Sequence, residues 1–266
     1  MSSVRVEAVT VRGEAMEYIR FGCGTRPLIV LAGMSLNGIT DAPEEIVAVN
    51  TEFAKEYEVF VFDRHPTLAE GTTVTDMAED TACALDALGI RDADVMGFSQ
   101  GGMVALCLAI DRPELVHALL LVSTMCRPNP VSEETFSLWR DTALTGNVEA
   151  VNEVAFSRIY TERFRKENAG AFAALLPIGT PERCRRFAVL SEACRTFDRA
   201  DELSRIRCPA LVMGVWGDAV LSGEASVTIA EKLGCEVHMY EGYGHSICTE
   251  APDFQRRSID FFRRTH

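Results

Sequence analysis

The sequence contains few lysines and has no excess of positive charge. Only three of its 26 basic residues are lysines. The 39 acidic residues outnumber all the basic ones and give a formal net charge of −13. Nucleic acids and anionic membranes are bound through clusters of basic side chains that neutralise phosphates. The charge balance therefore argues against both as partners, and a small-molecule partner fits this chain better.

The chain also lacks long apolar runs. No stretch of about 18 apolar residues is present, so no membrane-spanning helix is expected. The first residues, Met1–Glu7, have neither the basic start nor the apolar core of a secretory signal. We therefore expect a cytoplasmic protein.

Recognisable cofactor and metal motifs are missing as well. The nine cysteines are odd in number and scattered, and none forms a C-x-x-C pair. The usual signs of a disulfide framework or a zinc site are therefore absent. The sequence shows no P-loop and no G-x-G-x-x-G after a strand, and its five histidines lack metal-ligand spacing. We expect no cofactor, no metal, and mostly buried, reduced cysteines.

What is present indicates a globular α/β protein. Hydrophobic residues make up 47% of the 266 residues and charged residues 24%, as in ordinary globular domains. At this length, one core with an insertion is favoured over two independent domains.

Eight segments have the pattern of strands. The first two are separated by Arg12–Glu14, which predicts a hairpin. Later strands alternate with helical patterns, and such helices require right-handed crossovers and a mostly parallel sheet covered on both faces. The expected strands are Val4–Val11, Met16–Phe21, Pro27–Leu31, Val59–Phe62, Ala93–Met96, Ala118–Val122, Ala210–Val215 and Glu236–Tyr240. The expected helices between and after them are 43–55, 75–88, 102–110, 224–233 and 252–264.

The alternation stops after the sixth strand. Residues 126–205 contain no convincing buried strand and show helical patterns instead. We expect this segment to form a helical lid inserted into a core made of residues 1–125 and 206–266. The expected lid helices are 133–141, 148–160, 169–176 and 181–196.

A G-x-S-x-G pattern lies between an expected strand and an expected helix. Its serine is Ser99, and its glycines are Gly97 and Gly101. A serine on a sharp strand-to-helix turn has its hydroxyl exposed above the sheet, and the flanking glycines leave space for that turn. Ser99 is therefore the candidate nucleophile.

Two later residues suit the roles of base and acid. His245 follows a glycine turn after the last strand, and Asp218 follows the seventh strand. Loops at the carboxyl ends of parallel strands are where catalytic groups gather. Taken singly, each residue is more typical of a structural loop position, but the order serine, aspartate, histidine is the one expected of hydrolases built on this type of sheet. Asp198 and Asp201 are competing acids, although they do not lie at a strand end.

A serine nucleophile also needs backbone N–H groups that stabilise the oxyanion. The amide of Gln100, directly after Ser99, is one candidate donor. The amide of Met34, in the loop after the third strand, is the second.

With these motifs together, the chain resembles the α/β-hydrolase superfamily over nearly its whole length. The resemblance rests on the serine turn, the Asp218 loop, the Gly-Tyr-Gly-His stretch at His245, and the Asp63–Arg64 pair. It implies an eight-stranded α/β sheet, a Ser99–His245–Asp218 triad and a helical cap over the pocket. The chain departs from the family in carrying Ala32 where many members have histidine, and in its sequence over 63–71.

The resemblance implies a serine hydrolase of small carboxylic esters, thioesters or lactones. Carbon–carbon bond hydrolysis of ring-cleavage products, or enol-lactone hydrolysis, is the nearest alternative, in which Arg127, Arg140 or Arg158 would bind a substrate carboxylate. A non-catalytic small-ligand receptor on the same fold is a third possibility, and a lyase or perhydrolase with the same triad is a fourth. The sequence leaves open whether the protein is a monomer or a homodimer.

Overall fold

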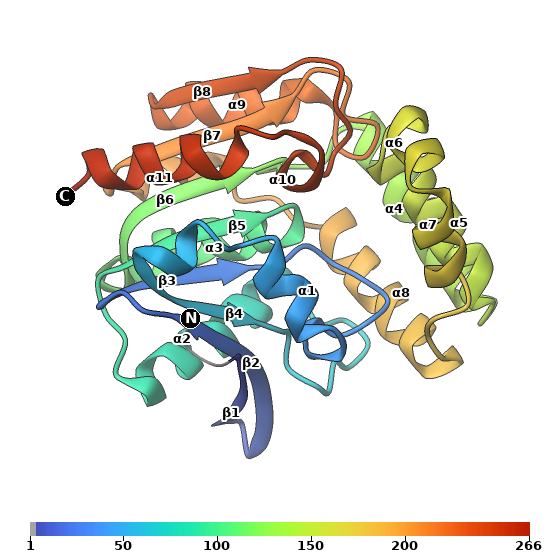
Figure 1. Ribbon diagram of the computed structural model, residues 1–266, viewed down its shortest axis with the longest axis horizontal. Helices are drawn as coiled ribbons and strands as arrows, with labels where there is room; N and C mark the ends of the chain where they lie inside the picture. The colour runs from blue at the N-terminus through green and yellow to red at the C-terminus, as the bar shows by residue number, and fades with distance from the viewer. Residues whose placement is uncertain (1–3) are drawn as a thin grey trace.

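The computed structural model describes residues 4–266, so the first three residues of the Met1–Glu7 stretch lie outside it. Its centre is one eight-stranded sheet with the strand order β1-β2-β4-β3-β5-β6-β7-β8 (Figure 1). The eight expected strands are all present, with ends that differ by at most two residues. The strands are β1 (Arg5–Val11), β2 (Glu14–Gly22), β3 (Arg26–Leu31), β4 (Tyr57–Phe62), β5 (Ala93–Phe98), β6 (Val116–Val122), β7 (Ala210–Val215) and β8 (Glu236–Tyr240).

The sheet is mostly parallel, as predicted. Strand β2 pairs antiparallel with β1 and with β4, and all other neighbouring pairs are parallel. The predicted hairpin turns at Arg12 and Gly13, whose φ angles are 49° and 85°. Two positive φ angles in succession are typical of the tight turns that match the twist of a two-stranded hairpin.

Helices cover both faces of the sheet (Figure 1). On one face, α2 (Val74–Leu88), α3 (Gln100–Asp111) and α9 (Gly223–Leu233) pack against the strands and form the larger hydrophobic core. On the other face, α1 (Pro43–Ala48) and α11 (Phe254–Arg264) cover a second core. Because both faces are buried, the central strands consist of nearly continuous apolar residues.

The segment between β6 and β7 is helical, and Figure 1 shows it to one side of the sheet. Its first and last helices pack on each other through Trp139, whose ring lies 5.7 Å from that of Phe136 and 5.8 Å from that of Phe187. The four expected helices are present, and α6 is an additional one. The helices are α4 (Pro130–Leu144), α5 (Val148–Ile159), α6 (Glu162–Glu167), α7 (Ala169–Leu175) and α8 (Pro181–Arg195).

The expected single helix over 43–55 is wrong. Helix α1 ends at Ala48, and a separate 3-10 turn, η2, covers Phe53–Lys55. The side chain of Asn50 donates to the carbonyl of Ile46 at 2.7 Å, which gives the backbone an alternative to continued helix. A short helix that was not expected, α10 (Ile247–Glu250), follows β8. Among residues 4–266, no helix has the length and apolar character needed to cross a membrane.

Candidate active site

The predicted site residues follow strands whose carboxyl ends share one edge of the sheet. Strands β3, β5, β6, β7 and β8 are all parallel, so the loops that follow them open on the same side. Met34 follows β3, Ser99 follows β5, Asp218 follows β7 and His245 follows β8. The topology therefore brings residues from distant parts of the sequence to one place.

Ser99 lies on a sharp turn between β5 and α3. Its φ and ψ angles are 50° and −119°, a region that non-glycine residues rarely occupy and that tends to mark functional sites. Two hydrogen bonds hold the turn: the Ser99 amide donates to the carbonyl of Val122 at 2.9 Å, and the Thr124 hydroxyl donates to the carbonyl of Ser99 at 2.7 Å. The main chain at Ser99 is thus fixed from both sides.

The two glycines of the motif are required by close packing. A Cβ atom on Gly101 would lie 1.9 Å from the carbonyl oxygen of Leu31, and one on Gly97 would lie 2.5 Å from the carbonyl oxygen of Gly101. Neither glycine has a positive φ angle. Their role is therefore to let α3 approach the ends of β3 and β5 closely.

His245 and Asp218 form a buried hydrogen-bonded pair. Nδ1 of His245 lies 2.8 Å from Oδ2 of Asp218, and the two residues are only 7% and 6% exposed. The other carboxylate oxygen accepts from the amides of Val220 at 2.8 Å and Leu221 at 2.9 Å. Burial raises the pKa of Asp218, but the electrostatic interaction and hydrogen bond with His245 and the hydrogen bonds from the two amides outweigh it, so the pKa is lowered overall. Asp218 therefore stays ionised at neutral pH.

The loop after β3 runs beside Ser99. A Cβ atom on Gly33 would lie 3.4 Å from the Cβ atom of Ser99, and the next residue, Met34, lines the same cavity as Ser99. Gln100 is the first residue of α3, so its amide has no acceptor within the helix. Both predicted oxyanion donors therefore belong to segments that border Ser99.

A buried arginine that the sequence did not single out for this role supports the same loop. The guanidinium of Arg64 donates to the carbonyl of Ala32 at 2.5 Å. Burial lowers the pKa of Arg64 to about 10, so its charge persists at neutral pH. In the sequence, the Asp63–Arg64 pair indicates only a family resemblance. Ala32 lies 32 residues before Arg64, and the sequence does not show that the Arg64 side chain reaches its carbonyl.

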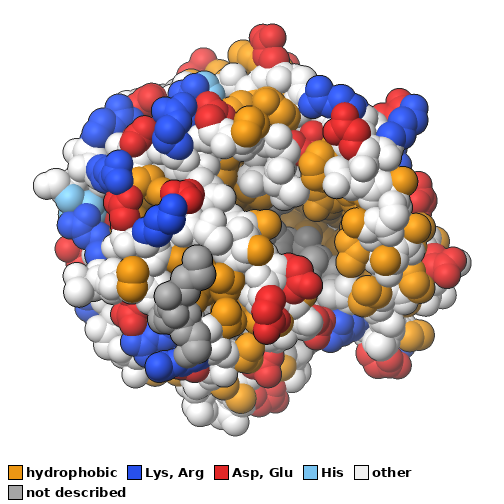
Figure 2. Space-filling model, viewed as in Figure 1, with side chains coloured by type: hydrophobic (Ala, Val, Ile, Leu, Met, Phe, Trp, Pro, Cys, Tyr) orange, Lys and Arg blue, Asp and Glu red, His pale blue; other side chains and the backbone are white. Residues whose placement is uncertain are grey.

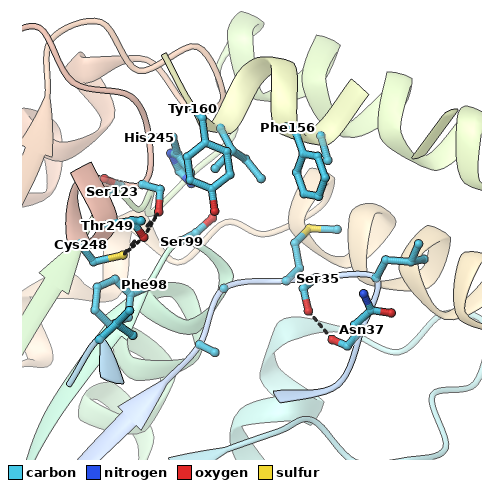
Figure 3. A pocket seen from close by; sticks show the side chains of 18 of the residues that line it. Ser35, Asn37, Phe98, Ser99, Ser123, Phe156, Tyr160, His245, Cys248 and Thr249 are labelled. Atoms are coloured by element: carbon cyan, nitrogen blue, oxygen red, sulfur yellow. Dashed lines mark hydrogen bonds between the residues drawn. The ribbon is translucent and has the colours of Figure 1, made fainter. Parts of the chain in front are cut away.

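Ser99 and His245 both line a cavity of about 400 Å³. In Figure 3 they lie at one side of it with Tyr160, while Phe156, Ser35 and Asn37 lie at the other. The walls come from the loop after β3, from α1 and from α4, α5, α7 and α8. The helical segment therefore forms a large part of the chamber in which Ser99 lies.

The three arginines expected to bind a substrate carboxylate do not line this cavity, and that expectation is wrong. Arg127 pairs with Asp198 and Asp201, Arg140 with Asp141 and Glu192, and Arg158 with Glu134. Each guanidinium therefore already has carboxylate partners at the protein surface.

Among residues 4–266, one cluster of three side chains could offer ligands to a metal ion, and it does not include Ser99 or His245. Asp94, His117 and His266 offer ligand atoms within 4.8 Å of one another, although their sequence positions gave no sign of it. The two imidazole rings stack at 4.1 Å with an 8° interplanar angle. An ion in the plane of one ring would lie outside the plane of the other, so this arrangement favours ring stacking over shared coordination.

Known proteins resemble this chain throughout. Residues 35–252 match the family described as the alpha/beta hydrolase fold. A protein of Rhizobium rhizogenes, provisionally named carbamate hydrolase RutD, is 29% identical over 90% of this chain and 93% of its own length. Among solved structures, the α/β hydrolase enzyme MGS-M2 from a Medee basin deep-sea metagenome library has a TM-score of 0.86 at 22% identity, covering 97% of both chains.

A second solved structure, the enol-lactonase of Burkholderia xenovorans, has a TM-score of 0.83 at 21% identity and covers 97% of this chain and 100% of its own. At such identities the likeness shows the fold, whereas the family match spans most of the sequence. This protein therefore belongs to the α/β hydrolase family and is a hydrolase.

Proposed function

We propose that the protein is a serine hydrolase of small carboxylic-acid derivatives, with Ser99 as nucleophile, His245 as base and Asp218 as the residue that orients His245. The observation that carries this proposal is the 2.8 Å contact between His245 and Asp218, buried beside the cavity that Ser99 lines. An aliphatic hydroxyl becomes a useful nucleophile only when a neighbouring base accepts its proton.

The reaction would proceed through an acyl-enzyme. Oγ of Ser99 attacks the substrate carbonyl while Nε2 of His245 takes the hydroxyl proton and then gives it to the leaving alcohol. Water, activated by His245, releases the acid. Asp218 keeps Nδ1 of His245 protonated and stabilises the imidazolium, a role that suits its lowered pKa.

The amides of Met34 and Gln100 would bind the oxyanion of the tetrahedral intermediate. Backbone donors of this kind stabilise an oxyanion efficiently when they are preorganised, because they then need not reorient during the reaction. Two contacts support this proposal: the hydrogen bond from Arg64 to the carbonyl of Ala32, and the close approach of Gly33 to Ser99. Since the donors are backbone groups, Ala32 in place of histidine leaves them intact.

The helices of residues 126–205 would act as a cap that encloses the acyl part of the substrate. Several cavity residues come from this segment, among them Trp139, Phe156 and Phe187. We further propose a cytoplasmic location and a small-molecule substrate, since all nine cysteines are free and the net charge is −13.

The substrate class is an ester, thioester or lactone. The names of the relatives refer to a carbamate and an enol-lactone, and both contain the same type of acyl carbon that a serine attacks. Hydrolysis of a lactone or carbamate would need no residue beyond those already named.

Labelling by a fluorophosphonate probe tests the nucleophile. The wild-type protein should react at Ser99, and Ser99→Ala should not. The matched control is Ser258→Ala, which removes another buried serine hydroxyl, one that donates to the carbonyl of Phe254 at 2.8 Å. Labelling of Ser99→Ala at the wild-type rate would remove Ser99 from the mechanism.

A further inference from the structure

The cavity beside Ser99 has an uncharged wall. None of the described residues that line it is Asp, Glu, Lys or Arg. Burial raises the pKa of Tyr160 to about 12 and also raises the pKa of Cys248, so both side chains are neutral at pH 7. Most of the remaining wall is aliphatic or aromatic. Its apolar residues include Met34, Leu36, Ile46, Val49, Trp139 and Phe156.

Arginines near the cavity have partners elsewhere. Arg183 of α8 binds Asp41 and the side chain of Asn37. Arg186 of the same helix binds Asp63 at 3.2 Å. To reach a substrate carboxylate, either cation would have to abandon a carboxylate it already pairs with.

The polar residues of the wall are also largely engaged with the protein. The amide of Asn152 donates to the carbonyls of Leu175, Leu176 and Ile178, at 3.3, 2.9 and 3.1 Å. The amide of Asn50 donates to the carbonyl of Ile46. These side chains stabilise the wall of the cavity, so their donor groups are not available to a charged substrate.

The surface around the opening adds to this effect. Figure 2 shows the molecule hollowed between the sheet and the cap helices, with hydrophobic side chains around the hollow and acidic ones over α1. The acidic residues of α1 are Glu44 and Glu45, and both are exposed. An anion that approaches the opening therefore meets negative charge before it meets an apolar wall.

Building on the function proposed above, we infer that the substrate is an uncharged ester or lactone with an apolar acyl part, and that acyl groups bearing a second carboxylate are rejected. Burying an unpaired carboxylate is strongly unfavourable, because nothing replaces the water that it loses. Burying a methylene group in the same place is favourable and raises the binding affinity about fourfold. A volume of about 400 Å³ lies near the lower end of the range for small-molecule sites, which suits a small substrate.

Three methyl esters of similar shape test the inference: monomethyl adipate, dimethyl adipate and methyl 6-methylheptanoate. The first ends in a carboxylate, the second in a neutral polar ester, and the third in an isopropyl group of the carboxylate's shape. Acid release is titrated with wild-type protein and with Ser99→Ala. We expect kcat/KM for the monoacid to be at least about 100-fold below that for methyl 6-methylheptanoate, with dimethyl adipate within tenfold of the latter.

The outcomes separate the inference from the function on which it rests. Suppose that wild type hydrolyses monomethyl adipate with a kcat/KM within tenfold of that for methyl 6-methylheptanoate, and that Ser99→Ala does not hydrolyse it. This result overturns the charge preference and leaves the serine mechanism standing. Turnover that persists in Ser99→Ala, or no turnover of any of the three esters, overturns the proposed function and this inference with it.

Ser123 lies directly after β6. Its φ angle is 43°, it is only 2% exposed, and its hydroxyl has no hydrogen-bond partner among residues 4–266. Its amide donates to the carbonyl of Met213 at 2.8 Å, which fixes the strained main chain. Ser123 lines the same cavity, on the side of Ser99 and His245 (Figure 3).

We propose, again on the basis of the serine mechanism, that the Ser123 hydroxyl forms a hydrogen bond with a substrate oxygen or nitrogen beside the scissile bond. A strained conformation and an unpaired buried hydroxyl both cost free energy, and a substrate atom would supply the missing partner. Ser123 would then be the polar contact that orients an otherwise apolar substrate.

Ser123→Ala tests this role, with Ser258→Ala as the control. For Ser123→Ala we expect kcat/KM on methyl 6-methylheptanoate to fall about 3- to 10-fold, the worth of one hydrogen bond, and the thermal midpoint to stay at or above wild type. Ser258→Ala should show the reverse, a lower midpoint and unchanged kcat/KM. An unchanged kcat/KM for Ser123→Ala would overturn the proposal.

Discussion

Adding one methyl group at Gly101 should misplace the nucleophile. In Gly101→Ala the new Cβ atom would lie 1.9 Å from the carbonyl oxygen of Leu31 and 2.6 Å from that of Ala32. Contacts between carbon and oxygen normally begin at about 3.3 Å. Helix α3 must therefore move away from the end of β3 by about 1.4 Å, and Ser99 moves with it because it immediately precedes α3.

The size of the effect follows from that displacement. A misplacement of about 1 Å at a reacting group costs about 100-fold in rate, so we expect kcat/KM to fall at least that much. Forcing an extra carbon into a well-packed region costs about 1–3 kcal/mol. A loss of about 2 kcal/mol lowers the thermal midpoint of a protein of this size by about 4–8 °C.

The assay compares ester hydrolysis and thermal unfolding of Gly101→Ala with those of Gly170→Ala. Gly170 lies in α7, and a Cβ atom there would have nothing within 4 Å. Alanine is also the better helix former, so Gly170→Ala should keep wild-type activity and lose no stability. Wild-type kcat/KM in Gly101→Ala would refute the reasoning, because it would mean that α3 has room to accept the side chain.

Three further predictions concern the acid, the cap and pH. Asp218→Asn should lower kcat about 10⁴-fold, because an amide favours the wrong tautomer of the base; stopped-time hydrolysis assays would measure it. Trp139→Ala, which empties a site only 1% exposed, should lower the free energy of unfolding by about 3–5 kcal/mol in urea titrations. Hydrogen bonds from Arg195 and then Arg140 lower the pKa of Glu192 to about 2. The stability from this group should be complete above its unfolded pKa of about 4.3 and decline as pH falls toward 2. Glu192→Gln should flatten that part of a stability curve measured against pH.

The sequence predicted the sheet and the positions of Ser99, Asp218 and His245 because local signals specify them. Continuous apolar runs mark buried parallel strands, and Ser99 and Asp218 follow such runs. His245 instead follows the partly exposed edge strand β8 and is marked by the glycine turn before it. Strands β5, β6, β7 and β8 are parallel, so the residues after their carboxyl ends lie at the same edge of the sheet. Their proximity therefore follows from topology alone.

Side-chain contacts between distant segments were not predictable in the same way. The bond from Arg64 to the carbonyl of Ala32 and the pairing of Arg158 with Glu134 depend on how loops and helices pack. A guanidinium has the same sequence signature whether it binds a substrate or a neighbouring carboxylate. The expectation that Arg158 would bind a substrate failed for this reason, since helical spacing does not reveal which face of a cap helix meets the cavity.

The cap and the nucleophile turn are joined through one side chain. Gln100, next to Ser99, is fully buried. Its side-chain nitrogen, Nε2, lies 3.1 Å from the carbonyl oxygen of Leu190 and 3.1 Å from the sulfur of Cys194. Arg183 adds an ion pair between the same helix, α8, and Asp41 of the core. Displacing α8 would break these contacts beside Ser99.

The other end of the cap is held less firmly. Helices α6 and α7 contain no buried residue, whereas α8 buries seven, including Cys184, Phe187 and Leu190. Segments with few buried apolar contacts open at the lowest free energy. If the helical segment acts as the proposed cap, we therefore expect opening to begin near α7, which lines the cavity through Leu175, while α8 stays with the core. A substrate could then enter without disturbing the turn that holds Ser99, because that turn contacts α8.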